Sequence, residues 1–326
     1  MDIDLSVLRL LEREKEIPFG ELVEIIEAAI LAAYFKHVRE NTKGPRAVID
    51  RKTGHVNIYS PVLDDEGMPT GEETDVTPEG FGRVAAYAAK QVIAQRMREL
   101  SDEGLLGEFK GKEGDIVAGV IQQGSRPYMV YVNLGSIEAL LPPEEQVPGE
   151  DYSHGRRIRV YVTSVQKGPR GPQITVSRTH PNLVRKLFAL EVPEVANGQV
   201  EIASVAREAG HRTKIAVVAK EPGINAKGAC IGELGQRVRA VSAELNEEKI
   251  DVVDFNEDLA KFVAHALSPA KVSDAFVIDQ AQKAVRVLVP DFQLSLAIGK
   301  EGQNARLAAK LTGAKIDIQP DSVLEG

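Results

Sequence analysis

Two stretches near the end of this 326-residue chain repeat each other, and the repeat limits the possible folds more than any other feature. Residues 231–236 read Ile-Gly-Glu-Leu-Gly-Gln, and residues 298–303 read Ile-Gly-Lys-Glu-Gly-Gln. Arg239 and Arg306 follow at matching positions, and Lys-Ile-Asp comes after both copies. Unrelated turns would rarely share these flanks, so the sequence indicates a duplicated structural unit.

The pattern inside each copy predicts what the unit is. In the second copy an apolar segment ends at Ile298, a Gly-x-x-Gly turn follows, and an apolar helix stops at Gly313 before a strand at 315–318. Glycine lets the backbone approach a phosphate closely, and the next helix offers free N–H groups to the anion. Helix, Gly-x-x-Gly, helix and strand are typical of a KH domain, which holds single-stranded RNA through this loop. Strand pairs ahead of both loops, near 200–219 and 276–289, favour the bacterial type-two topology.

The same glycine pattern at 111–114 is predicted to be an ordinary turn, because no apolar helix is expected before it and a strand pattern at 116–121 follows. Tyr128 and Tyr131 lie at odd spacing, so at most one of them stacks on a base, and a core or rim position is the alternative. Ala-Leu-Leu-Pro at 139–142 and the segment 114–120 resemble S-one-type RNA-binding domains. Five strands fit a small OB barrel, and they are expected at 116–121, 128–135, 137–142, 157–165 and 173–177.

An α+β domain is predicted ahead of the barrel. Helix is expected over 2–40 with a break at Pro18, then a hairpin over 47–60 and a polar loop over 63–75. Thr77 is predicted to cap a further helix that runs to about Leu100. The helix faces fit either a protein-docking surface or a solvated surface, and the pattern favours neither.

Charge is distributed unevenly along the chain. The first 107 residues hold 20 acidic and 13 basic residues, and they account for most of the net charge of −8. Clustered basic residues are an electrostatic footprint for phosphates, with a basic solvated face as the alternative. Between Tyr152 and Leu190 there is no acidic residue but eight basic ones: Arg156, Arg157, Arg159, Lys167, Arg170, Arg178, Arg185 and Lys186.

Cys230 is the only cysteine, which excludes an intrachain disulfide and favours a reducing compartment. It is expected to be a buried, unreactive thiol.

No apolar run approaches the roughly 18 residues of a membrane span, and no secretory segment begins the chain, which favours a cytoplasmic protein. Histidines lack metal-ligand spacing, and the acidic residues at 64–66 and 72–73 are better explained as a solvated loop than as a metal site. No catalytic residue, metal site or cofactor is predicted.

An acidic helical domain, an S-one-type barrel and two tandem KH domains, in this order, resemble the NusA family of bacterial transcription factors. The resemblance implies a non-enzymatic factor whose N-terminal domain binds RNA polymerase and whose barrel and KH domains bind nascent RNA. It implies effects on pausing, termination and antitermination, other antitermination factors as partners, and a monomeric chain. It covers the whole chain and is carried by both loops and by 49–54, 75–83, 138–143, 171–174, 177–181 and 187–194. The expected domains are 1–107, 108–182, 183–258 and 259–326.

Two other function classes remain as alternatives. One is an accessory subunit of an RNA-degrading complex, because phosphorolytic ribonucleases also carry KH and S-one-type domains. Those enzymes have the two domain types in the reverse order, and the N-terminal domain here is too small for their catalytic core. The other is an RNA-binding translation or ribosome-assembly factor built from the same modules.

The two loops are predicted to bind RNA unequally. Glu233 stands in the first loop where the second keeps Lys300, and it would cost ~0.3–1 kcal/mol beside a phosphate. The second loop is therefore expected to contribute more affinity. Five of the expected contacts are cations that would neutralise phosphates: Arg178, Arg237, Arg239, Lys300 and Arg306. The full set of expected RNA-binding residues is Ile231, Gly232, Gly235, Gln236, Arg237, Arg239, Ile298, Gly299, Lys300, Gly302, Gln303, Arg306, Arg157, Lys167 and Arg178.

Overall fold

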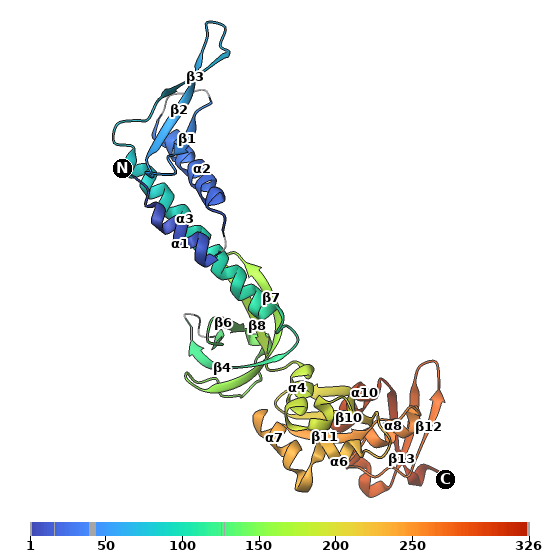
Figure 1. The fold of residues 1–326 in the computed structure, drawn as a ribbon. Coiled ribbons are helices and arrows are strands. Elements are labelled where there is room, and N and C mark those ends of the chain that lie inside the picture. The colour runs from blue at the N-terminus through green and yellow to red at the C-terminus, as the bar shows by residue number, and fades with distance from the viewer. Residues whose placement is uncertain (1, 16, 39–43, 125, 127, 325–326) are drawn as a thin grey trace. The chain divides into compact units, whose positions relative to one another are not determined.

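The structure is a computed structural model that describes the chain except residues 1, 16, 39–43, 125, 127 and 325–326 (Figure 1). The chain divides into two compact units, Met1–Leu105 and Leu106–Gly326. The first has a single apolar core, and the second combines the barrel with the two KH domains.

The first unit is α+β, as predicted. Leu22, Ile26 and Ile30 lie on one stripe of a long helix and pack with Ile58 and Phe81. The helix break near Pro18 and the first hairpin also follow the prediction. Its sheet has the order β1-β2-β3 and is antiparallel. Its elements are α1 (Leu5–Lys15), α2 (Phe19–His37), β1 (Arg46–Ile49), β2 (Val56–Leu63), β3 (Pro69–Asp75) and most of α3 (Gly82–Lys110).

Three predictions for this region are wrong. The expected loop at 63–75 contains β3, whose seven residues are all exposed, so no apolar alternation marks it. Thr77 does not cap α3, which begins at Gly82 and continues past Leu100. The Thr77 hydroxyl instead accepts a hydrogen bond from the backbone N–H of Ile58 at 2.8 Å, which fastens the segment to β2. Residues 39 and 40 of the predicted helix lie outside the described residues.

The barrel at the start of the second unit is closed and five-stranded, as predicted. Its strands follow the order β4-β5-β6-β8-β7 around the barrel. Phe109, at the end of α3, is 1% exposed and fills one end of the barrel core. Residues 111–114 form a turn, as predicted, and the long helix α3 ends directly before them at Lys110. The strands are β4 (Ile116–Gln123), β5 (Val130–Asn133), β6 (Glu138–Leu141), β7 (Arg157–Gly168) and β8 (Gly171–Ser177).

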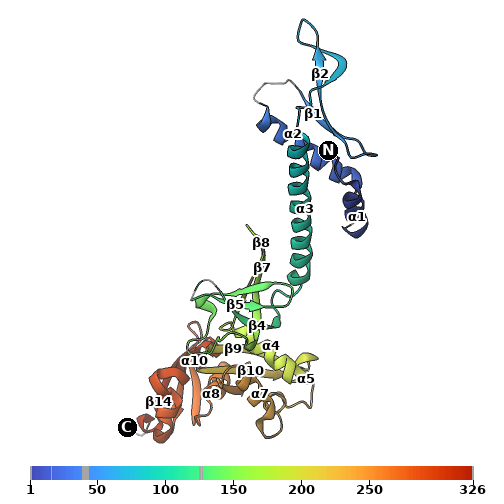
Figure 2. The same ribbon diagram turned by 90° about the vertical axis from the view of Figure 1, so that its left-hand side faces the viewer.

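The first KH domain contains a three-stranded sheet of order β11-β10-β9, with β10 and β11 parallel. Figure 2 shows α4 lying beside β9. A short helix, a glycine loop and a second helix connect β10 to β11. The elements are α4 (Pro181–Glu191), α5 (Pro193–Ala196), β9 (Val200–Glu208), β10 (Arg212–Ala219), α6 (Ala226–Ile231), α7 (Gln236–Glu244) and β11 (Lys249–Asp254).

The second KH domain repeats this order, so the duplication is real in three dimensions. Its sheet has the order β12-β13-β14, and β13 and β14 are parallel. Its first helix, α8, is not among the predicted elements. The elements are α8 (Leu259–Ala266), β12 (Asp274–Asp279), β13 (Ala284–Val289), α9 (Leu294–Ile298), α10 (Gln303–Thr312) and β14 (Lys315–Pro320).

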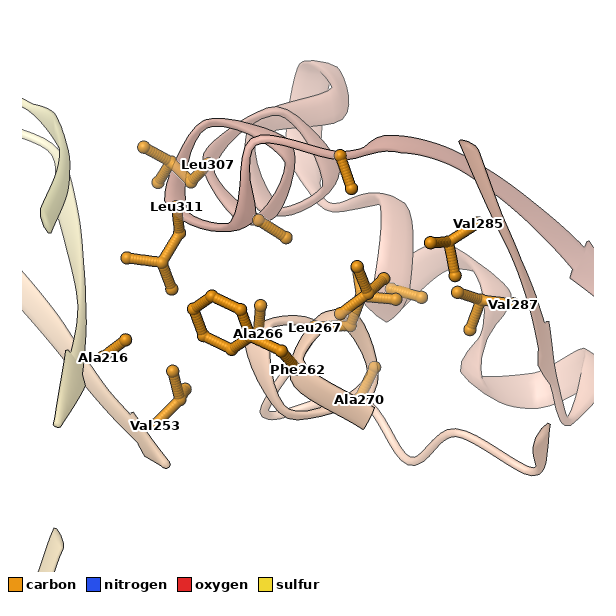
Figure 3. Close-up of a cluster of buried hydrophobic side chains, with 14 of the residues drawn as sticks. Ala216, Val253, Phe262, Ala266, Leu267, Ala270, Val285, Val287, Leu307 and Leu311 are labelled. Atoms are coloured by element: carbon orange, nitrogen blue, oxygen red, sulfur yellow. The ribbon is translucent and has the colours of Figure 1, made fainter. Parts of the chain in front are cut away.

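The two KH domains share one hydrophobic core. Phe262 and Leu311 of the second domain lie between their own helices and the side chains of Ala216 and Val253 from the first (Figure 3). Lys214 of β10 is fully buried and donates to the backbone oxygen of Ser268 at 2.6 Å. Burial on this scale fixes the two domains, and hence their two glycine loops, relative to one another.

Candidate nucleic-acid interface

The two glycine loops have nearly the same backbone. Gly232 has φ 76° and ψ 171°, and Gly299 has φ 80° and ψ 168°. The closing glycines, Gly235 and Gly302, also lie at positive φ, 76° and 72°. Only glycine adopts these angles without strain, so the repeated letters encode a repeated turn. In each copy the turn delivers the chain into the N-terminus of a helix, where free N–H groups can meet an anion.

The first glycine of each loop is also required for space. A Cβ on Gly299 would lie 2.7 Å from the backbone nitrogen of Asn304, and one on Gly232 would lie 2.6 Å from Cγ of Arg237. Asn304 is buried and donates from Nδ2 to the backbone oxygens of Leu267 and Ala297. These bonds tie the second loop to the shared core.

Four of the side chains predicted to bind RNA are exposed at the two loops. Gln236, Arg239 and Lys300 are exposed, and within the described residues their side chains form no hydrogen bond or ion pair. Ile298 is 38% exposed beside its loop, and Ile231 is half-buried. These side chains are free to meet RNA.

Arg237 makes contacts within the first KH domain. Its Nη1 lies 2.8 Å from the carboxylate of Glu194 and donates to the backbone oxygen of Ala229 at 2.8 Å. The guanidinium therefore joins α5, α6 and α7 within the first KH domain. Its charge is already paired before RNA arrives.

Arg306 and Gln303 are also engaged, by a residue of the other KH domain. Glu208, the last residue of β9, accepts from Arg306 Nε at 2.6 Å and from Gln303 Nε2 at 2.9 Å. Arg306 Nη1 donates to the backbone oxygen of Glu301 in the loop. Nothing in the sequence around Glu208 points to this contact, because it joins positions 98 residues apart.

In the barrel, Arg157 and Lys167 are exposed on β7, and neither forms an ion pair within the described residues. Arg157 borders a groove with Arg159, Asn133 and Leu134, on the side of the barrel that meets the end of α7. Both cations are placed where a passing RNA strand could reach them.

The prediction that Arg178 neutralises a phosphate is wrong. Its side chain is 2% exposed and pairs with the carboxylate of Glu150, which is 1% exposed. Its remaining donors meet the backbone oxygens of Arg159 at 2.9 Å and of Glu244 at 2.8 Å. Arg178 thus joins the barrel to the first KH domain and is not available to RNA.

Other members of the basic interval are also neutralised by carboxylates from outside it. Arg159 pairs with Glu244 at 2.8 Å, and Lys186 lies 3.4 Å from Asp115. Arg156 lies 3.6 Å from the Asp151 carboxylate. The interval therefore contributes fewer open cations than its sequence suggests.

Comparison with known proteins identifies the family. Four family models match the chain: the NusA N-terminal domain at residues 5–63, the S1 RNA binding domain at 110–177, and the NusA-like first and second KH domains at 178–255 and 259–325. The transcription termination/antitermination protein NusA of Mycobacterium tuberculosis is 56% identical over 329 residues, which cover 99% of this chain and 94% of that protein. This chain belongs to the NusA family. The NusA proteins of Bacillus subtilis and Thermus thermophilus are 46% and 37% identical, over 98% and 97% of this chain and 91% and 89% of theirs.

Membership of the NusA family decides between the function classes left open by the sequence. The relatives are transcription termination/antitermination proteins. They confirm a transcription factor with RNA-binding S1 and KH domains, and not an enzyme. Among the described residues, no cluster of three or more His, Cys, Asp or Glu side chains could hold a metal, and no helix has both the length and the apolar character of a membrane span.

The remaining expectations concern single side chains of this NusA-family chain. Tyr128 is 63% exposed and precedes β5, whereas the ring of Tyr131 lies against Gly124, where a Cβ would be 1.8 Å from it. Of the two, Tyr128 is the one open for stacking. Cys230 is fully buried, and burial raises the pKa of its thiol to about 11, in agreement with the inert role expected.

Proposed function

We propose that this chain holds single-stranded nascent RNA in its two glycine loops while its N-terminal domain binds RNA polymerase. The matching backbone of the two loops carries the proposal for RNA. A KH loop clamps the RNA backbone through such a turn, and the adjacent groove reads the bases. Because a common core fixes the two loops, both would bind one RNA strand together, and the affinity of the pair would exceed that of either loop alone.

Each part of the chain has a role in this proposal. Residues 1–107 would bind polymerase, the barrel at 108–182 would attract RNA through Arg157 and Lys167, and the KH domains at 183–258 and 259–326 would clamp it. Exposed Arg239 and Lys300 would supply charge at the two loops. The capture step is electrostatic and therefore weakens as salt rises.

Acting with other antitermination factors, such a chain would influence pausing, termination and antitermination. The names of its relatives support the last two roles. We propose that it does so as a monomer in the cytoplasm, where bacterial RNA polymerase works.

Matched loop variants test the RNA part of the proposal. Gly302→Asp and Gly235→Asp place the same charge at the same position of each loop, both at positive φ. We expect Gly302→Asp to lower the affinity for a single-stranded RNA by up to about five-fold, because a surface charge is worth up to about 1 kcal/mol. Gly235→Asp should lower it less, since Glu233 has already weakened the first loop. Fluorescence titration of labelled RNA measures both.

The same variants separate RNA binding from polymerase binding. Both should still be retained by immobilised core RNA polymerase to the same extent as the unaltered chain. A larger loss of RNA affinity in Gly235→Asp would contradict the ranking of the loops. Unchanged RNA affinity in both folded variants would remove the glycine loops from the proposal.

A further inference from the structure

A groove lies between the first KH domain and the loop of the second, and its charges are unusual for an RNA site. Lys249, Lys300 and Arg306 line it together with His211, but so do three carboxylates, Glu208, Glu247 and Glu301. Glu208 is the one that binds loop groups directly. It accepts from both Gln303 and Arg306, and its side chain is only 19% exposed.

The two copies of the duplicated unit differ at this contact. In the first copy Gln236 and Arg239 occupy the positions of Gln303 and Arg306, and both are exposed. Within the described part of the chain, no carboxylate pairs with either of them. Glu208 therefore occupies, in the second loop, the two groups that the first loop leaves open, and it neutralises one of them, Arg306.

The contact is not needed to hold the two KH domains together. Phe262, Leu307 and Leu311 of the second domain already share a buried core with Ala216 and Val253 of the first. A rim ion pair adds at most about 1 kcal/mol to such an interface. Its main effect is therefore on the charge available to a ligand.

A carboxylate and an RNA phosphate compete for the same donors. Both bind a guanidinium through charge-assisted hydrogen bonds. The hydrogen bond from Arg306 lowers the pKa of the Glu208 carboxyl, so this group stays ionised at neutral pH and repels a second anion in the groove.

We propose that Glu208 is an internal competitor of RNA at the second KH loop: its carboxylate occupies Arg306 and Gln303, so this loop binds RNA less tightly than its own residues would allow. The inference rests on the proposed function, since it assumes that RNA reaches the second loop. A residue of the first KH domain thus controls the RNA affinity of the loop in the second KH domain.

Substitution of the carboxylate by its neutral isostere tests the proposal. Glu208→Gln keeps the size of the side chain and removes its charge. The affinity of the full chain for a single-stranded RNA should rise about two- to five-fold at low salt, the range of a surface ion pair. Because Arg306 becomes free to contact a phosphate, the slope of log affinity against log salt should steepen by roughly 0.7.

A control variant on the same strand separates this effect from a change of net charge. Glu201 lies at the other end of β9, where it pairs with Lys220. Glu201→Gln changes the net charge by the same amount and should leave RNA affinity and salt slope close to those of the unaltered chain. An equal gain in both variants would show a general charge effect and overturn the proposal.

A double-variant cycle with Arg306→Gln completes the test. The substitution should lower RNA affinity less in the unaltered chain, where Arg306 is occupied, than in the Glu208→Gln background, where it should remove the gain. A loss of RNA affinity in folded Glu208→Gln would mean that Glu208 supports the loop, and an unchanged affinity would mean that it does not compete. Either result overturns the inference, whereas Gly302→Asp, which tests the proposed function, can still weaken RNA binding.

Discussion

Arg178 offers the sharpest test of how the basic residues of this chain are used. Sequence places it in the cationic interval, and the structure buries it against Glu150. Arg178→Met removes the guanidinium and keeps most of the side-chain length. It leaves the Glu150 carboxylate buried, with the Tyr152 hydroxyl at 2.6 Å as its nearest donor. The backbone oxygens of Arg159 and Glu244 also lose a donor.

The expected cost follows from this geometry. Breaking a buried ion pair by removing one partner costs about 3–5 kcal/mol, because the other charge stays desolvated. For a unit of this size, 1 kcal/mol corresponds to roughly 2–4 °C in Tm, so the melting of the second unit should fall by about 6–20 °C. Adding Glu150→Gln should recover part of the loss, since no charge then remains buried and unpaired.

Calorimetry and RNA titration together distinguish the two roles. Arg157→Met is the matched control: it removes the same charge from an exposed position of the same barrel and should change stability by less than about 0.5 kcal/mol. We expect Arg157→Met to weaken RNA binding and flatten its salt dependence, with Tm unchanged. If Arg178→Met kept its Tm and weakened RNA binding like Arg157→Met, the assignment of Arg178 as a structural residue would be refuted.

Two further predictions concern titratable groups, the half-buried His180 and the buried Cys230. Burial lowers the pKa of His180, whose Nδ1 accepts a hydrogen bond from the backbone N–H of Asn182 at 3.0 Å and so caps α4. Because the unfolded chain then binds a proton at higher pH than the folded chain, the stability of the fold should fall as pH drops through about 6.5. The fall should be smaller in His180→Asn, which keeps a cap acceptor but does not titrate. Thermal melts across this range measure the difference, and equal pH dependence in both proteins would contradict it. Cys230 should react with a thiol reagent at neutral pH only after denaturant unfolds the first KH domain, and rapid labelling of the native chain would contradict its burial.

The glycine loops could be read from sequence because their structure is local. A Gly-x-x-Gly turn needs positive φ at its two glycines, and those residues lie within four positions of each other. The flanking helices and strands follow from short apolar periods. The barrel strands could be located for the same reason, since their apolar runs are short and β6 and the start of β7 alternate between buried and more exposed residues.

Other elements have no local signal. β3 is fully exposed and is held by backbone pairing to β2, so its composition resembles a loop. The predicted end of α3 at about Leu100 is wrong: the helix continues to Lys110, and Phe109 in its last turn is buried in the barrel core. Thr77 has the residue type of a helix cap, but a neighbouring strand takes its hydroxyl.

The sequence by itself determined that the chain carries a duplicated glycine loop, and with it the RNA-binding class of the two KH domains. Only the tertiary structure decided which cations are open to a ligand. Arg159 is neutralised by a carboxylate 85 residues away and Arg306 by one 98 residues away. Backbone turns depend on neighbours in the chain, whereas charge pairing depends on neighbours in space, and folding alone brings those together.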